Sequence, residues 1–114
     1  MFIRSTLLLS TCMILGAASG APAKDVGVPT IDIQKICRAS EREIRALFSD
    51  VTRDVFGPCM DDEREAHTQL VKDWATIPAF DKERCVQPAQ YLPSYVEWLV
   101  CVQMTEDVRK MLKD

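Results

Sequence analysis

Four cysteines follow the N-terminal segment of this chain, and they constrain its fold more than any other feature. An even number of cysteines in a small exported domain is typical of structural disulfides, which support a core too small to hold the chain alone. No C-x-x-C pair occurs and His67 is the only histidine, so the pattern disfavours a metal site and thiol redox chemistry. We expect no metal and no cofactor. The cysteines are Cys37, Cys59, Cys85 and Cys101.

The N-terminal segment predicts export. Arg4 precedes an apolar run that starts at Leu7, and Ala21-Pro22-Ala23 is an A-x-A cleavage site. We therefore predict a signal peptide over residues 1–23, cleaved near Ala23. The remaining residues, 24–114, are expected to form one periplasmic or secreted domain.

An alternative to a cleaved signal peptide is a lipoprotein signal. Leu9-Ser-Thr-Cys12 loosely resembles a lipobox, although Thr11 is bulky for the position before the cysteine. Ordinary cleavage would remove Cys12. No later apolar run nears the ~20 residues of a membrane span, so we expect none after cleavage.

The net charge disfavours one class of partner. The whole chain has a formal net charge of −3, and loss of Arg4 makes it more acidic. Because nucleic acids and anionic lipids attract basic surfaces, an acidic domain without a basic patch is a poor ligand for either. We expect no nucleic-acid partner, and an envelope protein or a second copy of the chain stays open.

Hydrophobic periodicity predicts a small all-α domain. Three helices are expected at about residues 31–50, 58–76 and 94–113. A mobile lead-in is expected up to Pro29, and an irregular Pro-rich connection over 77–93.

The first two helices have recognisable start signals. Thr30 or Asp32 can cap the first helix. Pro58 suits the first position of the second helix, which would place Asp61 and Glu63 in its first turn, at the positive end of the helix dipole.

The third helix has the clearest start signal and is apolar on two sides. Ser94 and Glu97 form a capping box, and Pro93 keeps the preceding residue extended. The expected core stripe consists of Tyr95, Trp98, Cys101, Val102, Thr105, Val108 and Leu112. A second row, on roughly the opposite face, consists of Val96, Val100, Met104 and Met111.

Two interpretations of this second row are open. It packs under residues 77–93 as core, or it forms a face for a partner or for self-association. Methionine and aliphatic side chains suit the second role because they adapt to varied surfaces.

The disulfide pairing is not fixed by the sequence, since four cysteines allow three pairings. Shorter loop closure favours Cys37 with Cys59 and Cys85 with Cys101. An idealised up-down-up bundle instead places Cys37 and Cys101 at similar heights. We prefer the sequential pairs.

Glu63 and His67, one helical turn apart, are the one pair of residues that resembles a catalytic or ligand site. In an enzyme Glu63 would orient His67 as a general base, or both would bind a ligand beside an aromatic wall of Tyr91 and Tyr95. No candidate nucleophile, second histidine or glycine-rich loop accompanies them. We therefore expect no enzyme, and a structural pairing at the rim of the core.

Five short motifs extend across the predicted domain. They are Cys37-Arg-Ala, Cys59-Met-Asp-Asp-Glu, Leu70-Val-Lys-Asp-Trp74, Cys85-Val-Gln-Pro88 and Tyr91-Leu-Pro-Ser-Tyr-Val-Glu-Trp98. Together they resemble a group of small exported four-cysteine proteins of alphaproteobacteria. The resemblance covers nearly all of residues 24–114; it implies a periplasmic or secreted helical protein and implies no activity.

A looser resemblance rests on the rhythm of the second helix. Cys59-x-x-x-Glu63-x-x-Ala66-x-x-x-Leu70 followed by Trp74 is similar to lysozyme-inhibitor-type envelope proteins, although the cysteines here are further apart. No inhibitory residue carries over. The expected function is a non-enzymatic interaction module of the cell envelope. The alternatives are a ligand-binding protein or enzyme using Glu63 and His67, and a lysozyme-inhibitor-like protein.

Overall fold

The computed structural model describes residue 16 and residues 27–114. The predicted cleavage site at Ala23, the lipobox alternative at Cys12 and the rest of the predicted signal peptide, apart from Gly16, lie outside the described residues.

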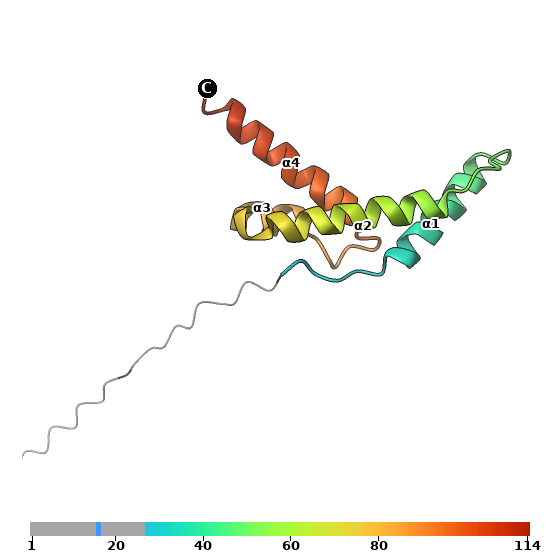
Figure 1. The fold of residues 1–114 in the computed structure, drawn as a ribbon, viewed down its shortest axis with the longest axis horizontal. Coiled ribbons are helices and arrows are strands. Elements are labelled where there is room, and N and C mark those ends of the chain that lie inside the picture. Colours follow the sequence, from blue (N-terminus) through green and yellow to red (C-terminus); the bar gives the residue numbers. More distant parts are fainter. Residues whose placement is uncertain (1–15, 17–26) are drawn as a thin grey trace, which may run out of the picture.

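All regular secondary structure in the described part of the chain is helical, with no β-strand there, as the sequence predicts. Its elements are α1 (Ile33–Leu47), α2 (Phe56–Asp73), the short 3₁₀ helix η1 (Trp74–Thr76), α3 (Ala79–Cys85) and α4 (Tyr95–Met111). In Figure 1, α2 is central: α1 packs at its N-terminal end, and α4 crosses it and rises away from the body. α3 packs against α4.

The first helix is shorter at both ends than the predicted 31–50. Asp32 caps it, because its side chain accepts a hydrogen bond from the backbone N–H of Lys35 at 3.1 Å. The helix ends at Leu47, and the backbone N–H of Phe48 closes the last turn by donating to the carbonyl of Ile44. The predicted cap is therefore confirmed for Asp32.

The second helix begins two residues before the expected Pro58, so the prediction that Pro58 is its first residue is wrong. Asp54 explains the earlier start: one carboxylate oxygen accepts from the backbone N–H groups of both Phe56 and Gly57. Proline is tolerated here because the first N–H groups of a helix have no partner within it. As a result Glu63 lies beyond the first turn.

The connection over 77–93 is more regular than expected, because it contains α3. Pro78 precedes the helix, and Asp81 lies in its first turn, where negative charge complements the helix dipole. The helix ends at Cys85, which is half of a disulfide. The fold is thus a three-helix domain with an added two-turn helix on α4.

The core lies between α2, α3 and α4. Trp98 and Leu70 are its largest fully buried apolar side chains. The expected core stripe of α4 is correct only in its first half: Val108 and Leu112 are 49% and 82% exposed, where the last turns of α4 rise away from α2 (Figure 1). The core cluster consists of Ala66, Leu70, Ile77, Cys85, Tyr95, Trp98 and Val102.

The lead-in before α1 is fixed to this core where the structure describes it, so the expectation of a mobile segment is wrong for its last residues. The hydroxyl of Tyr95 donates to the carbonyl of Pro29 and accepts from the backbone N–H of Ile31, both at 3.0 Å. Val28 and Ile31 also pack against the core.

Two disulfides join the helices in the preferred sequential pairing. Cys37 joins α1 to Cys59 on α2, and Cys85 at the end of α3 joins Cys101 on α4. The alternative pairing of Cys37 with Cys101 is therefore wrong. Two disulfides are consistent with an extracytoplasmic location.

Candidate functional site

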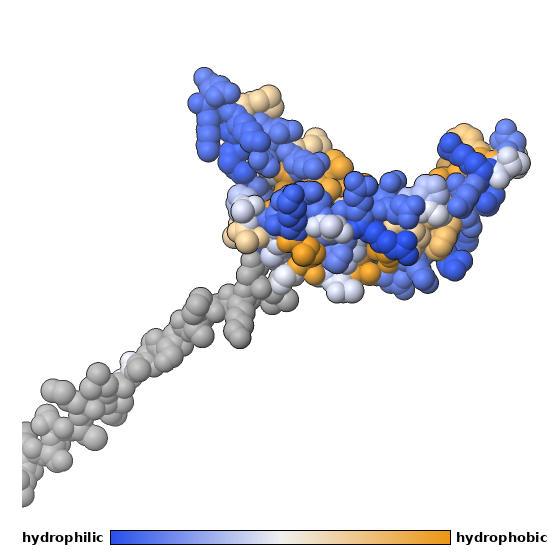
Figure 2. All heavy atoms as spheres, viewed as in Figure 1, coloured by the Kyte–Doolittle hydropathy of each residue, from blue (hydrophilic) through white to orange (hydrophobic). Residues whose placement is uncertain are grey.

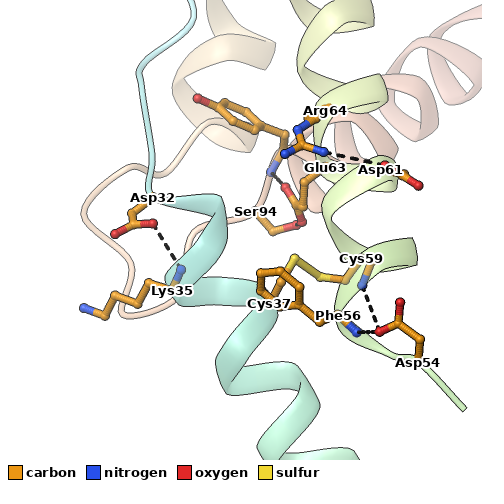
Figure 3. The surroundings of a disulfide bond; sticks show 12 residues. Asp32, Lys35, Cys37, Asp54, Phe56, Cys59, Asp61, Glu63, Arg64 and Ser94 are labelled. Carbon is orange, nitrogen blue, oxygen red and sulfur yellow. Dashed lines mark hydrogen bonds and ion pairs between the residues drawn. A yellow bond between two sulfur atoms is a disulfide. The ribbon is translucent and has the colours of Figure 1, made fainter.

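Glu63 is a buried carboxylate that holds the start of α4. It is 4% exposed; its Oε1 accepts from the hydroxyl of Ser94 at 2.5 Å, and its Oε2 accepts from the backbone N–H of Tyr95 at 2.8 Å. Figure 3 shows Glu63 pointing from α2 toward Ser94. Because a helix N-terminus leaves N–H groups unpaired, this carboxylate satisfies a donor that α4 cannot satisfy itself.

The predicted capping box at this position is thus only half present. Ser94 accepts from the backbone N–H of Glu97 at 3.3 Å, as predicted. The carboxylate that completes the cap comes from Glu63 on another helix.

His67 contacts an aromatic ring. It is half-buried, and its ring centroid lies 4.4 Å from that of Tyr95. The structure places both Glu63 and His67 against the start of α4, but the hydrogen-bonding partners of Glu63 are Ser94 and Tyr95. This arrangement favours a structural role for both residues, in which Glu63 caps the start of α4 and His67 packs against it.

The two tyrosines of the expected aromatic wall are not brought together as a shared surface. Tyr95 is 3% exposed and contacts Trp98 edge-on at 5.5 Å between centroids, whereas Tyr91 is 88% exposed. An aromatic wall made by both residues is therefore wrong.

The second apolar row of α4 is largely uncovered. Val100, Met104 and Met111 are 47%, 63% and 68% exposed, and only Val96 packs partly against the core. The interpretation that residues 77–93 cover the whole row is wrong, because α3 lies to one side of it and ends at Cys85. Figure 2 shows hydrophobic surface along the side of α4 that borders the angle between α4 and α2.

A groove of about 780 Å³ runs along this face between α3 and α4. Phe80, which is 65% exposed, adds an aromatic ring from α3. The polar border of the groove is the ion pair between Arg109 and the buried Asp81, with 2.5 Å between nitrogen and oxygen. Its apolar lining consists of Phe80, Val96, Val100, Met104, Val108 and Leu112.

A second groove, of about 660 Å³, lies between α1, α2 and the start of α4. It shares Val96 and Glu97 with the first groove, so the two meet at the N-terminal end of α4. Its character is acidic, since Arg53 is the one basic residue among its lining. The exposed carboxylates are those of Glu43, Asp54, Asp62 and Glu97.

The far end of α4 carries both signs of charge, because Glu106 and Asp107 stand beside its basic residues. Arg109 and Lys110 lie in its last turn. The hydrogen bond to Glu106 and the negative charge of that carboxylate raise the pKa of Lys110 above its usual value. Lys110 is therefore a cation at neutral pH, and its side chain is exposed.

Sequence reasoning missed three residues of the candidate face. Phe80 was expected in an irregular segment, and Val108 and Leu112 were expected in the core. The apolar character of Phe80 next to Pro78 was the available signal. Phe80 is on α3, and it joins this face of α4 only through the way in which α3 packs on α4. A local sequence pattern does not predict that packing.

The described residues hold neither a candidate metal cluster nor a membrane-spanning helix. No group of three or more His, Cys, Asp or Glu side chains there is placed to hold a metal ion. No described helix is long and apolar enough to cross a bilayer. Comparison of the chain with protein-family models, with curated proteins and with solved structures gives no match.

Proposed function

We propose that this protein is a non-enzymatic protein-interaction module that works in the periplasm or after secretion. The observation that supports it most is the uncovered apolar row Val100, Met104 and Met111 on α4. In a chain stabilised by two disulfides and a small core, exposed apolar side chains in a continuous row are more costly than isolated ones, and such a row marks an interaction site.

The chemistry of the two grooves indicates which kind of partner would bind. The α3–α4 groove is apolar, and it leads into the acidic α1–α2 groove at Val96 and Glu97. An amphipathic helix fits this arrangement if it carries an apolar stripe with a basic end, since an apolar face in a hydrophobic groove is a common recognition mode.

The environment of Glu63 supports the non-enzymatic part of the proposal. Its carboxylate is buried, and both of its oxygens accept hydrogen bonds from the start of α4. A carboxylate used in this way stabilises the fold, and His67 next to it packs on Tyr95.

The test uses a photo-reactive amino acid in place of Met104 in the exported protein, within intact cells of its source. We expect a discrete protein adduct at this position. The same amino acid in place of Val71, a 55% exposed valine on α2, is the matched control and should give none.

The substitution Val100→Asp then separates an interface from a structural face. A folded variant whose adduct at position 104 is lost supports the proposal. Outright unfolding of the variant, or adducts that are equal at positions 104 and 71, contradicts it.

A further inference from the structure

The methionines of the described residues fall into two groups. Met60 on α2 is 5% exposed, whereas Met104 and Met111 on α4 are 63% and 68% exposed. Both exposed methionines belong to the uncovered row of α4, whose third member is Val100. In the part of the chain that the structure describes, the exposed thioethers are therefore confined to the candidate interaction face.

Met104 and Met111 lie on one line along α4. They are seven positions apart, which at ~100° and 1.5 Å per residue places them about 20° apart around the helix and about 10 Å apart along it. Met104 also lines the apolar groove between α3 and α4. A change in the polarity of both side chains therefore acts on the same side of the helix.

No free thiol competes with these thioethers within residues 27–114. The cysteines there are all in disulfides, Cys37 with Cys59 and Cys85 with Cys101. Mild oxidants attack sulfur side chains, and the reaction follows exposure. Within the described residues, the two exposed methionines are thus the side chains most open to such an oxidant.

Oxidation converts the apolar side chain of methionine into a polar one. A peroxide transfers one oxygen atom to the thioether sulfur, which loses two electrons, while the O–O bond breaks and the rest of the peroxide leaves as water or an alcohol. A methionine sulfoxide reductase reverses the change with two thiols, which become a disulfide while the oxygen leaves as water. The modification is therefore reversible.

We propose that Met104 and Met111 are modification sites that regulate the interaction face: their oxidation by a peroxide to the sulfoxide abolishes binding, and reduction restores it. Each sulfoxide oxygen needs a hydrogen-bond donor that an apolar partner surface does not supply, and burying a polar group without one is costly. Met60 takes no part because it is buried. The regulation rests on the proposed function, since it acts on the same row of α4.

Peptide mass mapping of the exported protein after treatment with hydrogen peroxide tests the sites. We expect one added oxygen atom on Met104 and one on Met111, with oxidation at least about tenfold slower at Met60, the internal control. The circular dichroism spectrum should not change, because the modified side chains are exposed. Equal rates at all three methionines, protection of either exposed one, or unfolding by the modification overturns the proposal.

Photo-crosslinking in intact cells tests the consequence for binding. A photo-reactive amino acid in place of Val108, which is 49% exposed and lies between the two methionines in sequence, leaves both thioethers intact. Its protein adduct should fall at least about tenfold after brief peroxide treatment, as expected for unpaired polar groups in an apolar contact. The variant Met104→Leu with Met111→Leu keeps apolar side chains of similar volume without sulfur, and its adduct should persist.

Removal of the peroxide tests reversibility in the same cells. The adduct at position 108 should return as the two sulfoxides disappear from the mass map. Sulfoxides that persist, or an adduct that returns while they remain, contradict the proposed cycle.

The outcomes also separate the regulation from the proposed function. If the adduct at position 108 persists after both sulfoxides have formed, or is lost equally in the leucine variant, the regulation fails and the interaction face remains. If the folded, untreated protein gives no adduct at positions 104 and 108, the proposed function fails and the regulation fails with it.

Discussion

The N-terminal helix pair, α1 and α2, and the C-terminal pair, α3 and α4, are each joined by one disulfide but are stabilised differently. α1 buries only Cys37, whereas α4 buries Tyr95, Trp98 and Val102. The C-terminal pair thus has a core beside its disulfide. α2 shares this core through Ala66 and Leu70, so it is α1 alone that depends mainly on its disulfide.

This difference also concerns exposed apolar residues. Leu47 and Phe48 at the end of α1 are 77% and 58% exposed. Val108, Met111 and Leu112 at the end of α4 are exposed apolar residues as well. On α1 these two lie at the end of the helix, where its last turn closes. On α4 the exposed residues form a row beside α3, and that is why we assign the interaction face to α4.

The largest expected effect comes from the core of the C-terminal pair. Trp98→Ala should lower the free energy of unfolding by about 3–5 kcal/mol, because it removes a large side chain that is 1% exposed. The matched change on α1, Leu47→Ala, should cost less than about 0.5 kcal/mol. Urea unfolding followed by circular dichroism measures both, and equal costs would show that α1 has a core of its own.

Removing each disulfide tests the comparison directly. The sequence separations are 22 and 16 residues, so each bridge contributes about 3 kcal/mol by restricting the unfolded chain. The double change Cys37→Ala with Cys59→Ala should free α1 while α2 and α4 stay protected, because α1 buries little else. The double change Cys85→Ala with Cys101→Ala should weaken protection throughout.

Amide hydrogen exchange distinguishes these outcomes residue by residue. Exchange in α1 that rises to the rate of an isolated helix, with unchanged exchange in α4, supports local release. Uniform loss of protection in the Cys37 and Cys59 variant would mean that α1 is part of the same cooperative unit.

The features that sequence predicts well here are local. Asp32 and Ser94 accept hydrogen bonds from N–H groups three residues later, and such caps are visible in a short pattern. The sequential disulfides also follow from short loop closure. The start of α2 was missed because Asp54, rather than Pro58, organises it.

The candidate face was predicted only in part, and the reason is its dependence on distant residues. Val100, Met104 and Met111 were identified from their helical spacing. Whether they are covered depends on where α3 docks and ends, which periodicity does not encode. The pairing of Glu63 with Ser94, 31 residues later, is likewise a tertiary contact.

A smaller effect is expected where α2 holds the start of α4. Glu63→Ala should cost about 1–3 kcal/mol, because it leaves the hydroxyl of Ser94 and the N–H of Tyr95 buried without their acceptor. Glu65→Ala removes the same charge from an exposed position on α2 and should change stability little. Urea unfolding measures both, and equal losses would attribute the effect of Glu63 to net charge.

The smallest effect is expected at the junction between the lead-in and the core. Tyr95→Phe keeps the ring that packs on His67 and Trp98 but removes the hydroxyl that joins Pro29 and Ile31. The loss should be about 1 kcal/mol, the usual net value of such hydrogen bonds.

The exchange rate of the Ile31 amide gives the sharper readout of this change, because Tyr95 is its acceptor. That rate should rise in Tyr95→Phe while the amides of α4 stay protected. Tyr91→Phe removes a hydroxyl from a side chain that is 88% exposed and should leave both rates unchanged.

If Ile31 stays protected in Tyr95→Phe, apolar packing of Val28 and Ile31 holds the lead-in without the hydroxyl. A rise confined to Ile31 would instead show that a single side chain of α4 fixes the segment that leads into α1, and so links the core to the helix that buries least.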